Sequence, residues 1–209
     1  MQVTIDGPAG VGKTSVGKEI AKKFSLLFIQ SGKLYRALAY GEVNDLEKES
    51  LSFRPTDNYE PELKMGDKIL SEELYTEEIS EAASKLAKEK NVRELINGRI
   101  NDIAKKNDVL VEGRDIGTEV LPNAEVKIYL TASTKERARR RKAQLQTDRS
   151  LKEIETGIKE RDNRDQTRKI APLTPAEDAE IIDTTSMTER EVVDQISRII
   201  IDRTTKPET

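Results

Sequence analysis

Residues 7 to 14 read Gly7-Pro8-Ala9-Gly10-Val11-Gly12-Lys13-Thr14, and Ser15 follows. A short β-branched run at residues 3–5 precedes this stretch, and Val16, Ile20 and Phe24 come after it at helical i, i+4 spacing. Strand, glycine-rich turn and helix in this order are typical of a phosphate-binding loop, where backbone N–H groups and the helix dipole surround an anion. The stretch therefore predicts a nucleoside triphosphate site at residues 7–15.

The last two residues of this loop carry the chemistry. We expect Lys13 to reach the β- and γ-phosphates of ATP as a point charge, and the Thr14 hydroxyl to ligate Mg²⁺. A glycine-rich turn of chance composition is the alternative interpretation. It does not explain why lysine and threonine stand in register directly after a strand.

The composition narrows the class of protein. The chain has 209 residues, of which 35% are hydrophobic and 36% charged, enough for one α/β domain with small insertions. It contains no cysteine and no histidine, which excludes disulfides, thiolate metal sites, cysteine nucleophiles and imidazole bases. The net charge of -3 argues against a general nucleic-acid binder. No apolar run approaches the ~20 residues of a membrane helix, and the N-terminus shows no targeting peptide, so we expect a cytoplasmic protein.

Short apolar runs predict the sheet. They lie at residues 3–5, 26–29, 108–112, 126–130 and 180–183. Helical patterns separate them, at 34–40, at 79–106, from about 133 and at 192–200. Buried strands that alternate with helices indicate a parallel sheet covered on both faces. The fold class is therefore α/β, a three-layer P-loop fold with a five-stranded parallel sheet, whose ligands lie at the carboxyl ends of the strands.

Residues 45–78 differ from the rest of the chain. This stretch is polar, contains Pro55 and Pro61, and offers short strand-like pieces near 51–53 and 68–70, with a plausible hairpin turn at 65–68. We interpret it as a small insertion on the main domain.

Arginines concentrate in the last third of the chain. Arg137, Arg139, Arg140 and Arg141 lie on one predicted helix, and Arg161, Arg164 and Arg168 follow at i, i+3, i+7 spacing, which predicts one helical face. A solvated, salt-bridged surface helix is the ordinary explanation of such a run. In a chain that also has a phosphate loop, the run of arginines favours a mobile arginine-bearing lid, because the charge of a transferring phosphoryl group has to be neutralised.

Four motifs in order along the chain carry a family resemblance: residues 7–14, Ser31-Gly32-Lys33-Leu34-Tyr35-Arg36, Glu112-Gly113-Arg114-Asp115-Ile116-Gly117-Thr118 and Lys159-Glu160-Arg161-Asp162-Asn163-Arg164-Asp165. Together they resemble the bacterial cytidylate kinases, which are nucleoside monophosphate kinases. The resemblance implies Mg²⁺-dependent, in-line transfer of the γ-phosphoryl group of ATP to CMP and dCMP. It also implies one kinase domain over 1–209, with a monophosphate-binding insertion at 41–95 and a lid at 146–170, acting as a monomer on small nucleotides without nucleic-acid or membrane partners.

The resemblance also assigns roles to individual residues. It places Ser84, Arg93 and Asp115 around the cytosine, where Asp115 would accept from N4 and Arg93 would donate to N3 or O2. It assigns the acceptor monophosphate to Ser31, Arg36, Arg114 and Arg168, and the sugar hydroxyl to Asp165. In the lid, Arg161 would bridge the donor and acceptor phosphates with help from Arg164, and Arg137 and Arg141 would flank the adenine.

Several alternatives remain open at this stage. Ser84 could be a small helix residue and Arg93 a surface partner of an acid, while Ser31 and Tyr35 could merely support a turn. A kinase for UMP, AMP or shikimate, a nucleotide-binding switch and a nucleic-acid-binding module are rival functions. The family pattern often has an acidic residue where this chain has Gln30, so a role of that position in orienting magnesium waters is in doubt.

Overall fold

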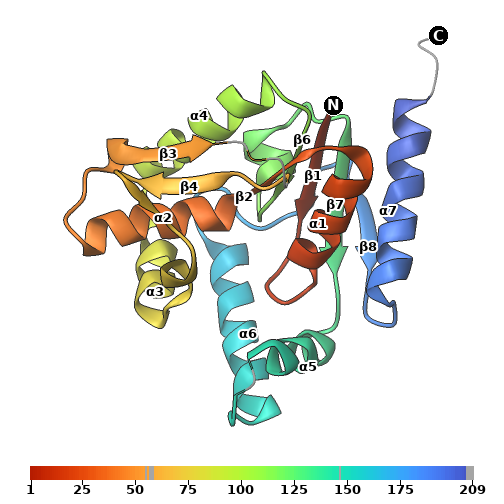
Figure 1. Cartoon of the computed structure of the whole chain (residues 1–209). Helices are drawn as coiled ribbons and strands as arrows, with labels where there is room; N and C mark the ends of the chain where they lie inside the picture. The colour runs from red at the N-terminus through yellow and green to blue at the C-terminus, as the bar shows by residue number, and fades with distance from the viewer. Residues whose placement is uncertain (55, 57–58, 146, 206–209) are drawn as a thin grey trace.

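Five parallel strands form the central sheet of the structure, a computed structural model that describes residues 1–54, 56, 59–145 and 147–205 (Figure 1). Their order across the sheet is β2-β6-β1-β7-β8. Their bounds are β1 Gln2–Asp6, β2 Leu27–Gln30, β6 Val109–Glu112, β7 Val126–Thr131 and β8 Glu180–Asp183. In register, Ile5 and Gln30 both lie beside Glu112, so the polar segments that follow these three strands meet at one edge of the sheet.

The period-2 alternation of the strands divides the core into two layers. Val3 and Ile5 pack with the helices α1 (Lys13–Phe24) and α7 (Glu189–Thr204) on one face. Val109 and Val111 pack with α2 (Ser31–Val43), α3 (Glu77–Leu86) and α4 (Lys90–Ala104) on the other. Strands buried on both faces need the continuous apolar runs that the sequence contains. The three-layer α/β fold predicted from the sequence is confirmed.

A three-stranded antiparallel sheet makes up much of the insertion. It consists of β3 Leu51–Arg54, β4 Glu62–Met65 and β5 Lys68–Ile69, with the 3₁₀ turns η1 Lys48–Ser50 and η2 Glu72–Tyr75 on either side. The predicted hairpin turn joins β4 to β5, with Gly66 at a φ of 58°. The β3–β4 connection returns to the central sheet, where the Tyr59 backbone oxygen accepts from the Phe28 N–H at 2.6 Å. The insertion is thereby attached to the edge strand β2.

Two helices form a lower lobe beside the sheet, α5 Thr134–Leu145 and α6 Leu151–Thr167 (Figure 1). Their shared core is small, with Ala138, Ile154 and Ile158 at its centre. Ser150 and Glu153 form a reciprocal capping box at the start of α6. Polar contacts join this lobe to the rest of the molecule, among them Arg137 to the Ala9 backbone oxygen and Asp165 to Arg114. No helix among the described residues is long and apolar enough to cross a membrane.

Two details differ from the sequence-based expectations. The helical pattern at 79–106 is two helices, which separate at residues 87–89 because α3 packs along α2 whereas α4 also contacts the turn after β6. Arg168 does not share a helical face with Arg161 and Arg164. α6 ends at Thr167, and Arg168 is extended at φ −63° and ψ 141°, held there by hydrogen bonds to Ala171 and Asp115.

Candidate active site

The connection between β1 and α1 is a tight loop at the start of a helix. Gly7, Gly10 and Gly12 have φ values of 144°, 76° and 101°, which glycine adopts without the strain other residues meet. A Cβ atom at Gly7 would overlap the backbone oxygen of Leu130 on β7. α1 begins at Lys13, so its positive end points into the loop, as an anion site requires.

This geometry gives a prediction about stability. We expect Gly7→Ala to lower the free energy of unfolding by about 2 kcal/mol or more, because the new methyl group combines backbone strain with a clash against β7. Gly98→Ala on α4 is the control, since a Cβ there meets nothing within 4 Å and alanine favours the helix by about 0.5–1 kcal/mol. Urea unfolding measures both. Equal midpoints for Gly7→Ala and the wild type would contradict the loop geometry.

Lys13 is folded back onto its own loop. Its Nζ donates to the backbone oxygens of Gly7 at 2.8 Å and Pro8 at 2.9 Å, and the side chain is buried. Burial lowers the pKa of Lys13 well below its usual value, and the positive charge of Arg114 lowers it further. A bound polyphosphate would reverse this effect, since an anion stabilises the ammonium form. The side chain thus bonds to carbonyl oxygens, while the charges of Glu112 and Asp6 offset part of the decrease in pKa.

The Thr14 hydroxyl lies against the end of β6. It donates to the Glu112 carboxylate, at 2.8 Å to Oε1 and 3.1 Å to Oε2. Across the described residues, no group of three or more His, Cys, Asp or Glu side chains could hold a metal by itself. Mg²⁺ commonly takes one or two protein oxygens and completes its shell with phosphates and waters. A hydroxyl beside a carboxylate fits that donor set.

Helix α5 supports the phosphate loop from outside. Arg137 donates to the Ala9 backbone oxygen at 3.0 Å and pairs with Asp162 of α6 at 2.7 Å. Arg140 donates to the Val11 backbone oxygen at 3.3 Å. Within the loop, Ser15 Oγ donates to the Gly12 backbone oxygen at 3.1 Å. The loop is therefore connected to the lower lobe through guanidinium groups.

A buried carboxylate lies between two arginines beyond the end of β6. Asp115 is 6% exposed and pairs with the buried Arg93 through Oδ2 and with Arg168 through Oδ1, the latter at 2.8 Å. Arg93 comes from α4 and Arg168 from the segment after α6, so three distant parts of the chain meet here. Burial raises the pKa of the nearby Tyr35 hydroxyl, and the charges of Arg93 and Asp115 act on it in opposite directions.

Beside this cluster lie the other residues predicted for the acceptor monophosphate. Arg114 Nε pairs with Asp165 of α6 at 2.9 Å. The Arg36 guanidinium lies 5.6 Å from the centre of the Tyr75 ring, and its buried Nε has no hydrogen-bond partner among the described residues. Burial lowers the pKa of Arg36. Ser31 is buried, and its Oγ would be 2.7 Å from a Cβ atom at Gly113, which places it against the segment that carries Arg114.

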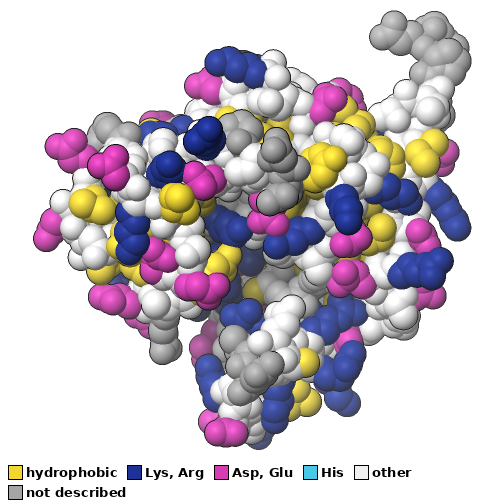
Figure 2. Space-filling view, viewed as in Figure 1, with side chains coloured by type: hydrophobic (Ala, Val, Ile, Leu, Met, Phe, Trp, Pro, Cys, Tyr) yellow, Lys and Arg dark blue, Asp and Glu magenta, His cyan; other side chains and the backbone are white. Residues whose placement is uncertain are grey.

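Positive charge concentrates where these groups meet, and Figure 2 shows Lys and Arg side chains around a hollow between the lower lobe and the rest of the molecule. Arg161 belongs to this set. Its side chain is exposed on α6, but neighbouring protein atoms still displace part of the water around the guanidinium. This desolvation, followed by repulsion from Arg114, lowers the pKa of Arg161 to about 10. Arg36 and Arg141 repel it as well, so the ligand-free protein holds an excess of cations facing one hollow.

Two other predicted residues lie apart from these contacts. Ser84 is exposed on α3, and Arg164 is exposed on α6. Arg141 is also exposed, on α5, and acts on Arg36 and Arg161 through its charge.

Two further residues lie at the site. Glu112, the acid that opens the third motif, is the partner of Thr14, and Arg140 contacts the phosphate loop one residue before the predicted Arg141. The sequence signal for Glu112 is a charged residue at the end of an apolar run. The signal for Arg140 is its i, i+3 spacing from Arg137 on the same predicted helix. Gln30 donates to Glu60 of the insertion at 3.3 Å, and Lys18 and Lys33 pair with the same carboxylate. In this structure Gln30 therefore helps to fasten the insertion.

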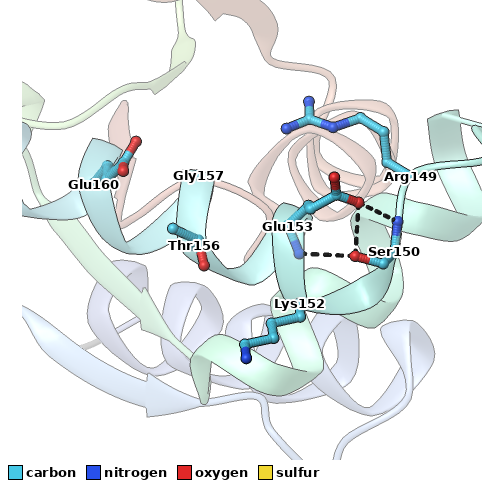
Figure 3. A pocket seen from close by; sticks show the side chains of 7 residues that line it. All are labelled: Arg149, Ser150, Lys152, Glu153, Thr156, Gly157 and Glu160. Atoms are coloured by element: carbon cyan, nitrogen blue, oxygen red, sulfur yellow. Dashed lines mark hydrogen bonds between the residues drawn. The ribbon is translucent and has the colours of Figure 1, made fainter.

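A separate surface hollow of about 420 Å³ lies on the first turns of α6 (Figure 3). It is lined by Arg149, Ser150, Lys152, Glu153, Thr156, Gly157 and Glu160. Ser150 and Glu153 bond to each other there as the helix cap. These lining residues are distinct from the charged set that faces the phosphate loop.

Comparison with known proteins places this chain in a family. The family profile described as "Cytidylate kinase" matches residues 3–202. The chain belongs to the cytidylate kinase family. A cytidylate kinase of Alkaliphilus oremlandii is 40% identical over 211 residues, covering 96% of this chain and 97% of its own. One of Geobacillus sp. strain WCH70 is 42% identical over 218 residues, covering 97% of each.

Solved structures agree on the fold of this cytidylate kinase family member. A shikimate kinase of Bacteroides thetaiotaomicron superposes with a TM-score of 0.52 at 14% identity, over 96% of this chain and 98% of its own. A shikimate kinase of Acinetobacter baumannii in complex with shikimate gives 0.53 at 14% identity, over 98% and 95%. At this identity the likeness concerns the fold alone, a P-loop kinase architecture.

Proposed function

We propose that this protein transfers the γ-phosphoryl group of ATP to CMP and dCMP, in an in-line, Mg²⁺-dependent reaction that yields CDP or dCDP and ADP. The observation that carries the proposal is the buried Asp115 beside Arg93, at the strand edge that bears the phosphate loop, in a chain of the cytidylate kinase family. Membership of the family supports the reaction. The paired acid and arginine support the choice of base.

The Asp115–Arg93 pair suits cytosine for a definite reason. A carboxylate has about four lone-pair positions, and Arg93 and Arg168 occupy only part of that capacity in Asp115. The pair can therefore accept from an exocyclic amine while donating to an adjacent ring acceptor, which is the edge that cytosine presents. Uracil reverses the polarity at both positions and would leave buried polar groups unpaired, at a cost of about 1–3 kcal/mol each.

The acceptor monophosphate would be held by arginines. In the proposal, Arg36, Arg114 and Arg168 bind it, together with Ser31 at the start of α2. Asp165 would release its ion pair with Arg114 and bind the sugar hydroxyl instead. Ser84, which is exposed, would have to turn toward the base. An already anionic phosphate oxygen needs no general base, so alignment and charge neutralisation supply the catalysis.

The donor side would use the phosphate loop. Lys13 would leave the Gly7 and Pro8 carbonyls and bind the β- and γ-phosphates. Arg161, assisted by Arg164, would bridge the donor and acceptor phosphates. Arg137 and Arg141 would lie beside the adenine. Mg²⁺ on Thr14 and Glu112 would neutralise phosphate charge and orient the phosphates. We further propose that 146–170 acts as a lid whose closure excludes water, and that 41–95 is the monophosphate-binding insertion, in a cytoplasmic monomer.

A panel of acceptors tests this function directly. With ATP and Mg²⁺, we expect rapid ADP release with CMP and dCMP, and rates at least ~10²-fold lower in kcat/KM with UMP and AMP because the base edge is mispaired. EDTA should stop the reaction. Equal rates across the panel would contradict the assignment of Asp115 and Arg93, and ADP release that does not depend on any monophosphate would contradict the kinase function itself.

A further inference from the structure

Asp6 is a buried acid that the proposed chemistry does not use. It is the last residue of β1 and stands directly before Gly7. The alternation of β1 turns Val3 and Ile5 toward α1 and α7, so Thr4 and Asp6 face the opposite layer. Asp6 is 5% exposed there. A carboxylate that is withdrawn from water requires strong partners in the protein.

Its partners are two consecutive backbone amides. Asp6 Oδ1 accepts from the Ile116 N–H at 3.0 Å, and Oδ2 accepts from the Gly117 N–H at 2.8 Å. Ile116 and Gly117 open a single π-helical turn, η3 Ile116–Val120, directly after Arg114 and Asp115. Two parallel hydrogen bonds from one carboxylate fix both the distance and the orientation of the segment they bind.

The other side of this contact is closely packed. A Cβ atom at Gly117 would lie 3.0 Å from Thr4 Oγ1 and 3.4 Å from Asp6 Oδ2. Glycine at this position therefore lets the amide approach the carboxylate. Burial raises the pKa of Asp6 to about 6, while the Gly117 and Ile116 amides act in the opposite direction. At neutral pH the group is accordingly ionised, the form that accepts from both amides.

We propose that Asp6 is a positioning residue that sets the spacing between the donor and acceptor subsites, by clamping the start of η3 to the end of β1. The inference rests on the proposed function. Asp6 precedes the phosphate loop by one residue, and Ile116 follows Asp115 by one residue. The clamp therefore joins the segment expected to bind ATP to the segment expected to bind CMP, without touching either nucleotide.

This role has a distinctive kinetic consequence. Loss of the clamp would shift one subsite relative to the other without rearranging the binding groups within either subsite, so binding of either nucleotide alone should change little. The reaction needs both in alignment, and misplacement by 1 Å can cost ~10²-fold in rate. A clamp between subsites therefore affects kcat far more than either binary dissociation constant.

The test is Asp6→Asn, which keeps the size of the side chain but turns its amide NH₂ group, a donor, toward one of the two backbone N–H donors. We expect kcat for CMP to fall ~10- to 10²-fold, while the dissociation constants of ATP and of CMP, each measured alone by calorimetry, change less than about threefold. Unchanged kcat would overturn the proposal. So would a loss of affinity for either nucleotide alone that accounts for the whole loss of activity.

Two further variants show whether the effect of Asp6→Asn comes from the clamp. Thr4→Val removes a hydroxyl that is equally buried on the same face of β1 and has no hydrogen-bond partner in the described part of the chain, and it should leave kcat and both dissociation constants unchanged. Gly117→Ala moves the η3 turn from the opposite side without changing any charge, and it should reproduce the loss of kcat with affinities retained. A Gly117→Ala protein with full kcat would count against the clamp.

Amide hydrogen exchange tests the clamp whether or not the protein phosphorylates CMP. The Ile116 and Gly117 amides should be protected in the wild type and should exchange ~10-fold faster or more in Asp6→Asn, whatever the substrate. If the wild type fails to phosphorylate CMP, the proposed function fails and the exchange result still tests the clamp. If the wild type phosphorylates CMP and the two amides exchange equally in both proteins, the clamp alone fails.

Discussion

Lys13→Ala is expected to reduce turnover by at least ~10³-fold, the upper range for losing one preorganised charge at a developing anion. The reason lies in the surroundings of the ammonium group. Lys13 is buried at the end of the phosphate loop and bonds to the Gly7 and Pro8 carbonyls. No other lysine follows the loop in register, so the variant has no substitute for the charge opposite the β- and γ-phosphates.

The measurement is kcat in the coupled ADP-release assay, with the thermal midpoint as the check on folding. Lys22→Ala is the matched control, because Lys22 lies in the last turn of the same helix and is exposed. We expect the control to keep full activity. A Lys13→Ala enzyme that folds and retains kcat within tenfold of the wild type would show that the loop does not act on the transferred phosphoryl group.

Arg161→Ala should lower kcat by ~10³-fold, the scale of an arginine that stabilises phosphoryl transfer. It should do so without loss of stability. Desolvation and then repulsion from Arg114 lower the pKa of Arg161 to about 10, while Asp165 acts in the opposite direction. Because the side chain is exposed, solvent screens these charges and Arg161 contributes little to the stability of the ligand-free fold. Removing its charge relieves the repulsion, and the thermal midpoint should stay equal or rise.

This combination distinguishes a catalytic from a structural arginine, because a structural residue would lose stability and activity together. Lys159→Ala is the control on the same helix. Lys159 pairs with Glu155 at 2.8 Å and is exposed, and its removal should leave kcat unchanged. Full turnover in Arg161→Ala, or a fall in its thermal midpoint that parallels the loss of activity, would contradict the role proposed for the lid.

The parts of the fold that the sequence predicted are those that short stretches determine. Short runs rich in apolar residues mark the five strands, and the phosphate loop is a local motif whose glycines have positive φ values. The separation of α3 from α4 was not visible, because residues 87–89 contain neither glycine nor proline. Tertiary packing against α2 decides that break, and propensity alone carries no signal of it.

In the functional site as well, some residues could be predicted from short stretches of sequence, whereas their contacts depend on how the chain folds. Lys13 and Thr14 could be assigned from the loop motif, and Arg93, Asp115 and Arg168 from a family resemblance. That these three side chains form one buried cluster depends on chain folding, since Asp115 lies 22 residues from Arg93 and 53 from Arg168. The contacts of Asp6 could not be predicted, because an acid at the end of a strand looks the same in sequence whether its carboxylate faces solvent or bonds to two backbone amides.

The tie between Tyr59 and Phe28 bears on how this chain behaves at high concentration. β2 is a rim strand of the parallel sheet, and rim strands with free amides invite strand addition from a second molecule, the first step toward cross-β association. The insertion supplies an internal acceptor to the Phe28 amide and stands over that rim. The insertion, which we propose binds the monophosphate, thereby also protects this edge of the sheet from strand addition by a second molecule.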